Sequence, residues 1–174
     1  MAARLVGQEP GVELPFNIQK EHRVGLGFAV TGFGSNFAYF VSPHYAYRYQ
    51  RHLLGFTPFY GNLDGLRKHH DIGIGLDYRL YPFKNLNTIL LYFPLGLHYN
   101  YRWSETTERS ALLYKVGFGV ETLVGKRLAL SLDANFGMGQ TIGSKQGSTE
   151  SIGFGTPQGL DYYFLPIIRI SYGL

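Results

Sequence analysis

The sequence lacks cysteine altogether, which excludes disulfide bonds and thiolate metal sites and leaves the redox compartment open. Charged residues make up only 16% of the 174 residues, whereas about 25% is usual in soluble domains. No apolar run approaches the roughly 18 residues of a membrane helix. The first twenty residues also lack the apolar core of a secretory signal. An exported protein would therefore have lost its signal, and the alternative is a cytosolic protein.

Glycine and aromatic residues, by contrast, are abundant in the chain. The chain has 23 Gly, 14 Tyr and 13 Phe, a composition that favours strands and tight turns over helices. Its length suits a single domain. The net charge of +4 is mild, and the Lys and Arg residues are scattered. A nucleic-acid surface is therefore not expected.

The stretch Asn87–Trp103 has the clearest pattern in the chain. Its residues alternate between an apolar face and a face of mixed small and polar residues, a period of two that predicts a β-strand. The strand is much longer than the usual length of about 5–6 residues. Its apolar face passes from aliphatic residues to Tyr99, Tyr101 and Trp103. That order is expected where hydrocarbon gives way to lipid headgroups, so these three residues are predicted to form an outer aromatic belt.

The same alternation predicts eight strands, preceded by an N-terminal tail over residues 1–20. The predicted domain is a barrel over residues 21–174. The strands are expected at Glu21–Gly32, Asn36–Tyr49, His52–Tyr60, His70–Tyr81, Asn87–Trp103, Ala111–Leu123, Leu128–Gly139 and Asp161–Leu174. Pro94 and Pro166 fall inside two of them, and each predicts a local bulge because proline removes a ladder hydrogen bond.

Volume decides which face of the strands points inward. The apolar faces carry about 47 side chains in all, far more than the interior of an eight-stranded barrel could hold. The opposite faces carry Gly-x-Gly pairs in four strands, as at Gly25 and Gly27, which suits a crowded interior. The barrel is therefore predicted to be inside-out, with its apolar face toward lipid.

Charge sorting agrees with that orientation. The apolar faces carry no charged residue in these frames, and an Arg or Lys facing lipid near the midplane costs about 2–4 kcal/mol. The small-residue faces also carry Asp71 and Arg102 near one end. Buried charges must be paired or hydrated. A structural network of salt bridges in the lumen is predicted, rather than an ion path or gate, and its members are Arg23, Arg48, Asp77, Arg79, Lys115, Glu121, Asp133 and Arg169.

The predicted connections alternate in length, apart from the first, after Gly32, which is short and breaks the pattern. Those at Gln50–Arg51, Pro82–Asn87 and Val124–Lys126 are short, whereas Gly61–His69, Ser104–Ser110 and Thr141–Leu160 are longer and polar. Outer-membrane barrels have short turns on the periplasmic side. Both termini are therefore predicted to be periplasmic.

With these features the chain resembles the small OmpA/OmpX-type outer-membrane barrels and the β-barrel family common in Bacteroidetes-type bacteria. The resemblance rests on the eight strands, on the segment Asp77–Phe83 and on the closing strand Ile168–Leu174. Many such barrels end in an aromatic residue, whereas this chain ends in Leu174. The resemblance implies a transmembrane antiparallel up-and-down β-barrel of a Gram-negative outer membrane, without catalytic, cofactor or metal sites.

One constellation suggests an alternative activity. His69, His70 and Asp71 lie near the outer rim with Asp64, and Ser104 could complete a Ser-His-Asp arrangement like that of an outer-leaflet lipid hydrolase or acyltransferase. Adjacent histidines in a strand point to opposite faces, however. The His-x-Ser-Asn-Ala segment of lipid A deacylase barrels is absent, and no histidine spacing repeats as in metal sites.

The expected function is that of a structural protein or an accessory subunit of a larger outer-membrane complex. Its expected partners are outer-membrane lipids and other outer-membrane proteins, and no nucleic acid. The seven outward residues of the second strand, four of them Tyr, form a possible docking surface. Two alternatives stay open: the lipid-modifying enzyme and a soluble lipocalin-like binder.

Overall fold

The computed structural model describes residues 20–33, 36–64, 69–83, 89–104, 108–124, 127–145, 154–155 and 160–174. Within these residues the chain is all-β, and no helix could span a membrane. The long strands are β1 (Lys20–Phe33), β2 (Asn36–Tyr49), β3 (His52–Asp64), β4 (His69–Leu80), β5 (Ile89–Trp103), β6 (Glu108–Val124), β7 (Leu128–Lys145) and β9 (Leu160–Gly173). A two-residue strand, β8 (Phe154–Gly155), pairs with β9.

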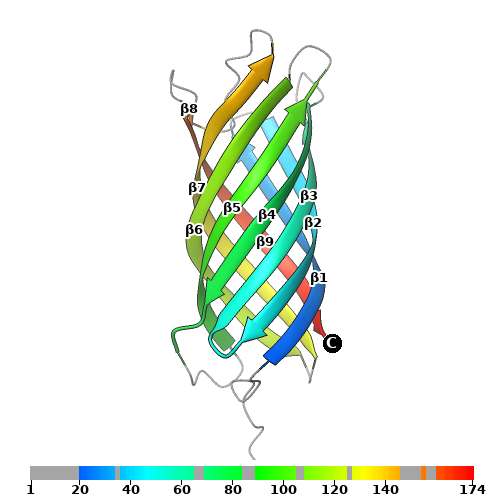
Figure 1. The fold of residues 1–174 in the computed structure, drawn as a ribbon, viewed down its shortest axis with the longest axis vertical. Coiled ribbons are helices and arrows are strands. Elements are labelled where there is room, and N and C mark those ends of the chain that lie inside the picture. The colour runs from blue at the N-terminus through cyan, green and yellow to red at the C-terminus, as the bar shows by residue number, and fades with distance from the viewer. Residues whose placement is uncertain are drawn as a thin grey trace, which may run out of the picture.

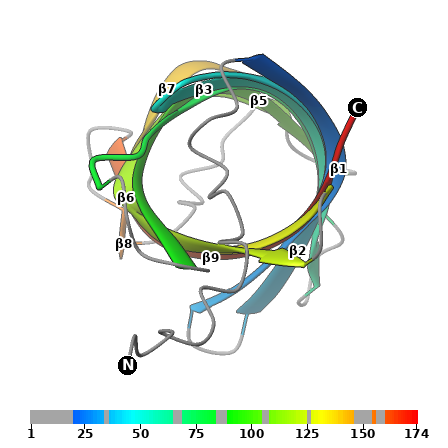
Figure 2. The ribbon, with the colours of Figure 1, turned by 90° about the horizontal axis from the view of Figure 1, so that it is seen from below.

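The eight long strands form one closed antiparallel barrel. Each long strand pairs with the next long strand along the sequence, and the short β8 pairs with β9 alone. β1 pairs with β9 from Arg23 opposite Gly173 to Ala29 opposite Ile167, and this pairing closes the sheet. The strands tilt strongly against the long axis (Figure 1), and the end view shows a continuous ring (Figure 2). The predicted fold class is confirmed.

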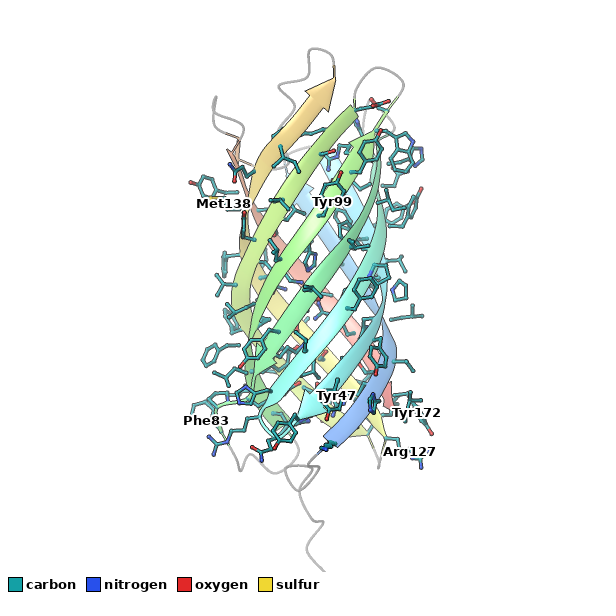
Figure 3. All side chains as sticks on the ribbon, viewed as in Figure 1. Tyr47, Phe83, Tyr99, Arg127, Met138 and Tyr172 are labelled. Carbon is teal, nitrogen blue, oxygen red and sulfur yellow. The ribbon has the colours of Figure 1, made fainter. Side chains whose placement is uncertain are left out.

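The apolar face of the barrel points outward, as predicted. In β5, Leu95 and Leu97 are 48% and 46% exposed, whereas His98 and Asn100, which follow on the opposite face, are 9% and 2% exposed. The same alternation runs along the other long strands, so large apolar side chains cover the outside (Figure 3). The polar and charged side chains fill the lumen instead.

Three strands extend further than predicted. β3 continues to Asp64, β6 begins at Glu108 and β7 runs to Lys145, so the predicted loops Gly61–His69, Ser104–Ser110 and Thr141–Leu160 are wrong in part. Beyond the apolar belt both faces of a strand are polar, and the alternation that marks a strand in the sequence fades. The ladder still continues there, because each backbone group needs a partner.

The strand prolines do not produce the predicted bulges. Partners on either side of Pro94 and Pro166 keep one register in the ladders that the structure describes. A proline removes one N–H but adds no residue, so the strands stay aligned. The register shifts instead between Ser110 and Ala111, whose partners are Gly143 and Thr141.

The two ends of the barrel differ in what they carry. Lys20 and Leu174 lie at one end, called the terminal end here, together with the turn at Gln50–Arg51 (Figure 1). Gln50 has φ of 52°, as tight two-residue hairpins require. The connection 81–88 at this end is longer than 65–68 at the opposite, loop end. The predicted alternation of short and long connections is therefore wrong in detail, because the strands extend further and leave shorter connections at the loop end. The predicted tail lies outside the described residues, except for Lys20.

Candidate functional site

At the terminal end, the lumen is organised around the carboxylate of Glu121 on β6. Its Oε1 lies 2.8 Å from Arg23 Nη1 and 3.7 Å from Arg48 Nη1, and its Oε2 lies 3.5 Å from Arg79 Nη1. These four side chains are at most 5% exposed. Arg23 also binds Glu21, with 2.8 Å between Nη2 and Oε2. One carboxylate thus joins arginines from β1, β2 and β4 across the barrel.

Two tyrosines close the space around this cluster. Tyr81 follows β4, is fully buried, and donates a hydrogen bond of 3.0 Å from its hydroxyl to Glu121 Oε2. Burial, with the Glu121 carboxylate nearby, raises the pKa of Tyr81 to about 12, so it remains a donor at neutral pH. The guanidinium of Arg48 lies 4.4 Å from the centre of the Tyr81 ring, and that of Arg79 lies 4.7 Å from the centre of the Tyr92 ring. These cation–π contacts pack the charges against aromatic surface.

A second network lies nearer the middle of the barrel and is organised around Asp77. Its Oδ1 lies 2.8 Å from both Lys115 Nζ and His98 Nε2, and its Oδ2 accepts a 2.8 Å hydrogen bond from Thr57 Oγ1. Arg169 Nη2 lies 3.7 Å from Asp77 Oδ2 and also forms an ion pair with Asp133. Arg169 thereby joins the two carboxylates.

A third, separate ion pair lies toward the loop end. Arg102 donates from Nε and Nη2 to the two carboxylate oxygens of Asp71, at 2.8 and 2.7 Å. Asn100 Nδ2 adds a weaker contact of 3.4 Å to Asp71 Oδ1. This two-point geometry gives the strongest form of an arginine–carboxylate pair.

The structure thus brings the eight predicted lumen residues into two adjoining networks. Arg23, Arg48, Arg79 and Glu121 form the first, and Asp77, Lys115, Asp133 and Arg169 form the second. Sequence reasoning missed the neutral partners Tyr81, Tyr92, His98 and Thr57. The alternation does place Tyr92, His98 and Thr57 on inward positions, so that signal was present.

Between the second network and the loop end the lumen holds a cavity of about 70 Å³. Its wall is largely apolar and includes Ala29, Phe40, Phe59, Leu113, Leu165 and Ile167. Three cationic side chains, those of Arg102, Lys115 and Arg169, also line it. As far as the structure describes the chain, no carboxylate does, because the Asp side chains lie behind their basic partners.

Cations also outnumber anions in the lumen as a whole. Among the described residues, the buried set holds seven Arg and Lys side chains but four Asp and Glu side chains. The basic members are Arg23, Arg48, Arg79, Arg102, Arg109, Lys115 and Arg169, and the acidic members are Asp71, Asp77, Glu121 and Asp133. Around the cavity, however, the charges are balanced, because Lys115 and Arg169 pair with Asp77 and Asp133, and Arg102 pairs with Asp71.

The predicted aromatic belt lies on the outside near the loop end. Tyr99 is 40% exposed, and its hydroxyl donates to Ser110 Oγ at 3.1 Å. Tyr101 stacks on Trp103, whose ring also stacks on His70, with centroids 5.9 and 5.4 Å apart. Figure 3 shows Tyr99 in the upper part of the barrel, with Tyr47, Phe83 and Tyr172 near the terminal end.

Of the residues proposed for an alternative lipid-modifying site, His69 and His70 lie on opposite sides of β4. His69 is buried, whereas His70 lies on the outer side, with its Nδ1 2.9 Å from the Tyr60 hydroxyl. Both Asp71 oxygens are held by Arg102. The side chain of Asp64 lies outside the described residues. Over the described part of the chain, no cluster of three or more His, Asp or Glu could hold a metal ion.

Comparison with solved structures identifies the fold. Neisserial surface protein A (NspA) superposes with a TM-score of 0.52 at 14% identity, over 89% of this chain and 94% of that chain. The N-terminal β-barrel domain of Pseudomonas aeruginosa OprF superposes with a TM-score of 0.50 at 8% identity, over 90% and 98%. No protein-family model matches the chain, and no curated protein matches it. The fold is that of the small eight-stranded outer-membrane barrels, which confirms the resemblance expected from the sequence.

Proposed function

We propose that this chain is an integral β-barrel of a Gram-negative outer membrane that acts without catalysis, as a structural protein or accessory subunit. Both termini then lie on the periplasmic side, and the lumen is closed by ion-paired side chains. The observation that carries the proposal is the pairing of an outward apolar surface with an inward charged one. The eight long strands alternate between the two faces, apart from the irregularity at Ser110 and Ala111 in β6.

The outward surface supports a membrane location. Soluble monomers rarely expose a contiguous apolar patch of more than a few hundred Å², whereas here such residues face outward on all eight long strands. Near the middle of β4, Ile74 and Leu76 are 52% and 55% exposed. A soluble lipocalin-like binder would bury this face and expose the charged one. The observed orientation favours lipid as the surrounding medium.

The lumen networks support a closed barrel. The Glu121 cluster and the Asp77 network follow one another along the axis, and their charged side chains are nearly all below 8% exposure. An eight-stranded barrel leaves an interior that side chains can fill. We expect planar bilayers containing the refolded protein to show no stable conductance steps. Large, long-lived steps would contradict a closed lumen.

The outer surface of β2 supports a role in a complex. Tyr45 and Tyr49 are 45% and 46% exposed, and Tyr39 and Tyr47 lie on the same side. Tyrosine is enriched where membrane proteins meet headgroups and at protein interfaces. Cross-linking in native membranes, with photoreactive residues at Tyr45 and Tyr49, is expected to capture a specific membrane partner. Cross-links to lipid alone would contradict the accessory role but would leave the barrel assignment intact.

Refolding tests the membrane assignment. From urea, the chain is expected to fold only when detergent micelles or phosphatidylcholine vesicles are added. Folding would appear as a β-sheet circular-dichroism spectrum and a mobility shift between unheated and heated samples on denaturing gels. A monomeric, folded protein in plain buffer would contradict the proposal. Protease accessibility of a tag at Leu174, in intact compared with permeabilised cells, tests the periplasmic position of the termini.

A further inference from the structure

Two histidines on the outer surface at the terminal end each contact a tyrosine of the next strand in the same way. His22 Nδ1 on β1 lies 2.5 Å from the Tyr45 hydroxyl on β2, and His52 Nδ1 on β3 lies 2.6 Å from the Tyr78 hydroxyl on β4. In both ladders the tyrosine stands opposite the residue two places after the histidine. The same diagonal contact thus occurs twice at this end of the barrel.

This hydrogen bond determines where the neutral imidazole carries its proton. A phenol hydroxyl is a better donor than the N–H of a neutral imidazole, so each tyrosine donates to Nδ1 and the ring proton lies on Nε2. In the protonated ring both nitrogens carry a proton. Nε2 is therefore a donor in both states. None of the described residues forms a hydrogen bond with Nε2 of His22 or His52.

Both histidines stand at the edge of the apolar belt. His22 and His52 are exposed, and the next outward residues toward the middle of the barrel, Val24 and Leu54, are 40% and 58% exposed. His22 pairs with Tyr47, which lies near the terminal end (Figure 3). The headgroup zone of a bilayer begins where its hydrocarbon ends. The two Nε2 donors are therefore expected at the depth of the lipid phosphates.

Charge at this end is divided between the outside and the lumen. Lys20 and Arg127 are exposed, and the Arg127 guanidinium lies 6.0 Å from the centre of the Tyr172 ring on the outer face (Figure 3). The carboxylate side chains described at this end, those of Glu21 and Glu121, are both bound by arginine in the lumen. The described side chains of the outer rim are thus basic or neutral, which is complementary to an anionic group.

We propose that His22 and His52 each bind the phosphate group of a membrane phospholipid through Nε2–H. The phosphate accepts this hydrogen bond outside the barrel, while the acyl chains of the lipid lie along the apolar belt. Tyr45 and Tyr78 act as positioning residues, because they hold each ring and keep the proton on Nε2. Lys20, on the same face as His22, adds a positive charge. This inference rests on the proposed membrane location and adds a lipid-binding site to it.

A third pair of this kind, formed by His70 and Tyr60 near the loop end, has different surroundings. Its Nδ1 lies 2.9 Å from the hydroxyl, and the tyrosine again stands opposite the residue two places after the histidine. His70 is only half-exposed, however, and Trp103 stacks on its ring with 5.4 Å between the centroids. The proposal is therefore confined to the two exposed histidines of the terminal end.

Solid-state NMR measures the proposed contact directly. The full chain, with isotope-labelled histidine, is refolded in phosphatidylcholine vesicles, and the dipolar dephasing of each Nε2 by lipid phosphorus is measured in frozen samples. A hydrogen bond of about 2.9 Å places the nitrogen about 4 Å from the phosphorus. We expect dephasing at His22 and His52 to be at least threefold larger than at His44 and His98, which are 8% and 9% exposed in the lumen. Equal dephasing at all four histidines would overturn the proposal.

Removal of the tyrosine hydroxyls tests whether the site is built or whether depth alone brings phosphate close. Tyr45→Phe and Tyr78→Phe keep the rings but release Nδ1, so the ring proton can move and Nε2 donates less often. We expect the dephasing at the histidine of each pair to fall at least twofold, with a shift of its nitrogen signals. Tyr99→Phe removes a hydroxyl that bonds to Ser110 instead and should change neither histidine. Unchanged dephasing in Tyr45→Phe and Tyr78→Phe would contradict the proposal.

Lipid association provides an independent test. In phosphatidylcholine vesicles, spin-labelled phosphatidylglycerol is expected to associate with the barrel at least twofold more than spin-labelled diacylglycerol, which lacks the phosphate. The double variant His22→Phe, His52→Phe keeps two aromatic rings but loses both N–H donors, and should lose at least half of this preference. The same preference in the variant and the wild type would overturn the proposal.

The gel mobility shift separates this inference from the proposed function. It is read for the wild type and for each variant in the same vesicles. A wild-type chain that never inserts would defeat the proposed function. An inserted barrel whose exposed histidines show no contact with lipid phosphate would defeat only this inference.

Discussion

Arg23 on β1 and Glu121 on β6 form a buried ion pair, 98 residues apart in the chain, with 2.8 Å between Nη1 and Oε1. Arg48 and Arg79 depend on the same carboxylate. Closure of the barrel is what brings these strands to opposite sides of one lumen. The ion pair can therefore form only when the barrel is closed.

Replacement of that carboxylate should be costly. Glu121→Gln keeps the volume but leaves three arginines without their shared counter-charge, and breaking a buried ion pair typically costs about 3–5 kcal/mol. Urea unfolding in lipid vesicles is expected to show a loss of that size. Glu108→Gln, at the half-exposed loop-end rim, should change the unfolding free energy by less than about 1 kcal/mol. Equal effects of the two substitutions would show that Glu121 does not organise the lumen.

The pair formed by Arg102 and Asp71 can be tested by a double-mutant cycle. Because both Asp71 oxygens are held by one guanidinium, Asp71→Asn and Arg102→Met should each destabilise the barrel. The double variant leaves neither charge alone, so its loss should be smaller than the sum by about 1–3 kcal/mol. Additive losses, measured by unfolding in vesicles, would mean that the two groups do not interact.

Depth dependence is expected on the outer surface. Leu76, near the middle of β4, is 55% exposed, and Phe83, beyond the terminal end of β4, is 54% exposed. Leu76→Arg should cost about 2–4 kcal/mol of folding free energy in vesicles, and Phe83→Arg about 0–1 kcal/mol. Their similar exposure makes them a matched pair. If the two costs were equal, lipid depth would not govern this surface.

A glycine pair tests the close packing of the wall. A Cβ at Gly117 would lie 2.1 Å from the backbone oxygen of Ala134, whereas a Cβ at Gly143 would meet nothing within 4 Å. Gly117→Ala should therefore destabilise the barrel by about 1–3 kcal/mol, as overpacking does. Gly143→Ala should be close to neutral. A neutral result at Gly117 would show that β6 and β7 can separate there at no cost.

Alternation in the sequence predicted most of the barrel because lipid and lumen demand opposite residue types at every step. This is why the eight strands and the inward charges follow from the sequence. The positions of the strand ends do not follow from the sequence. Beyond the lipid belt both faces of a strand meet water, so polar residues such as Asn62 and Gln140 can stand on either face. For the same reason the sequence did not predict that β7 extends to Lys145.

The partners within the lumen were only partly predictable. The alternation of residues along each strand placed Asp77 and Lys115 on inward faces. Their contact, however, depends on the register between β4, β5 and β6. The sequence pattern carries no register across strands far apart in the chain. Pro166 illustrates the same limit: it predicted a bulge, whereas the β7–β9 register continues past it and the β1–β9 pairing ends next to it, at Ile167. Which edge a proline faces follows from the hydrogen-bond pattern of the folded strand, and alternation alone does not contain it.

The central claim, that the apolar face contacts lipid, is tested most directly by spin labelling, which the absence of cysteine makes simple. Single cysteines at Leu130, Leu132 and Phe136 on β7, with Arg127 as the reference, would carry a nitroxide in the barrel refolded into vesicles. The structure predicts more frequent collisions with apolar oxygen than with a water-soluble nickel complex at the three belt positions, and the reverse at Arg127. Greater accessibility to nickel at Leu132 would contradict the claim.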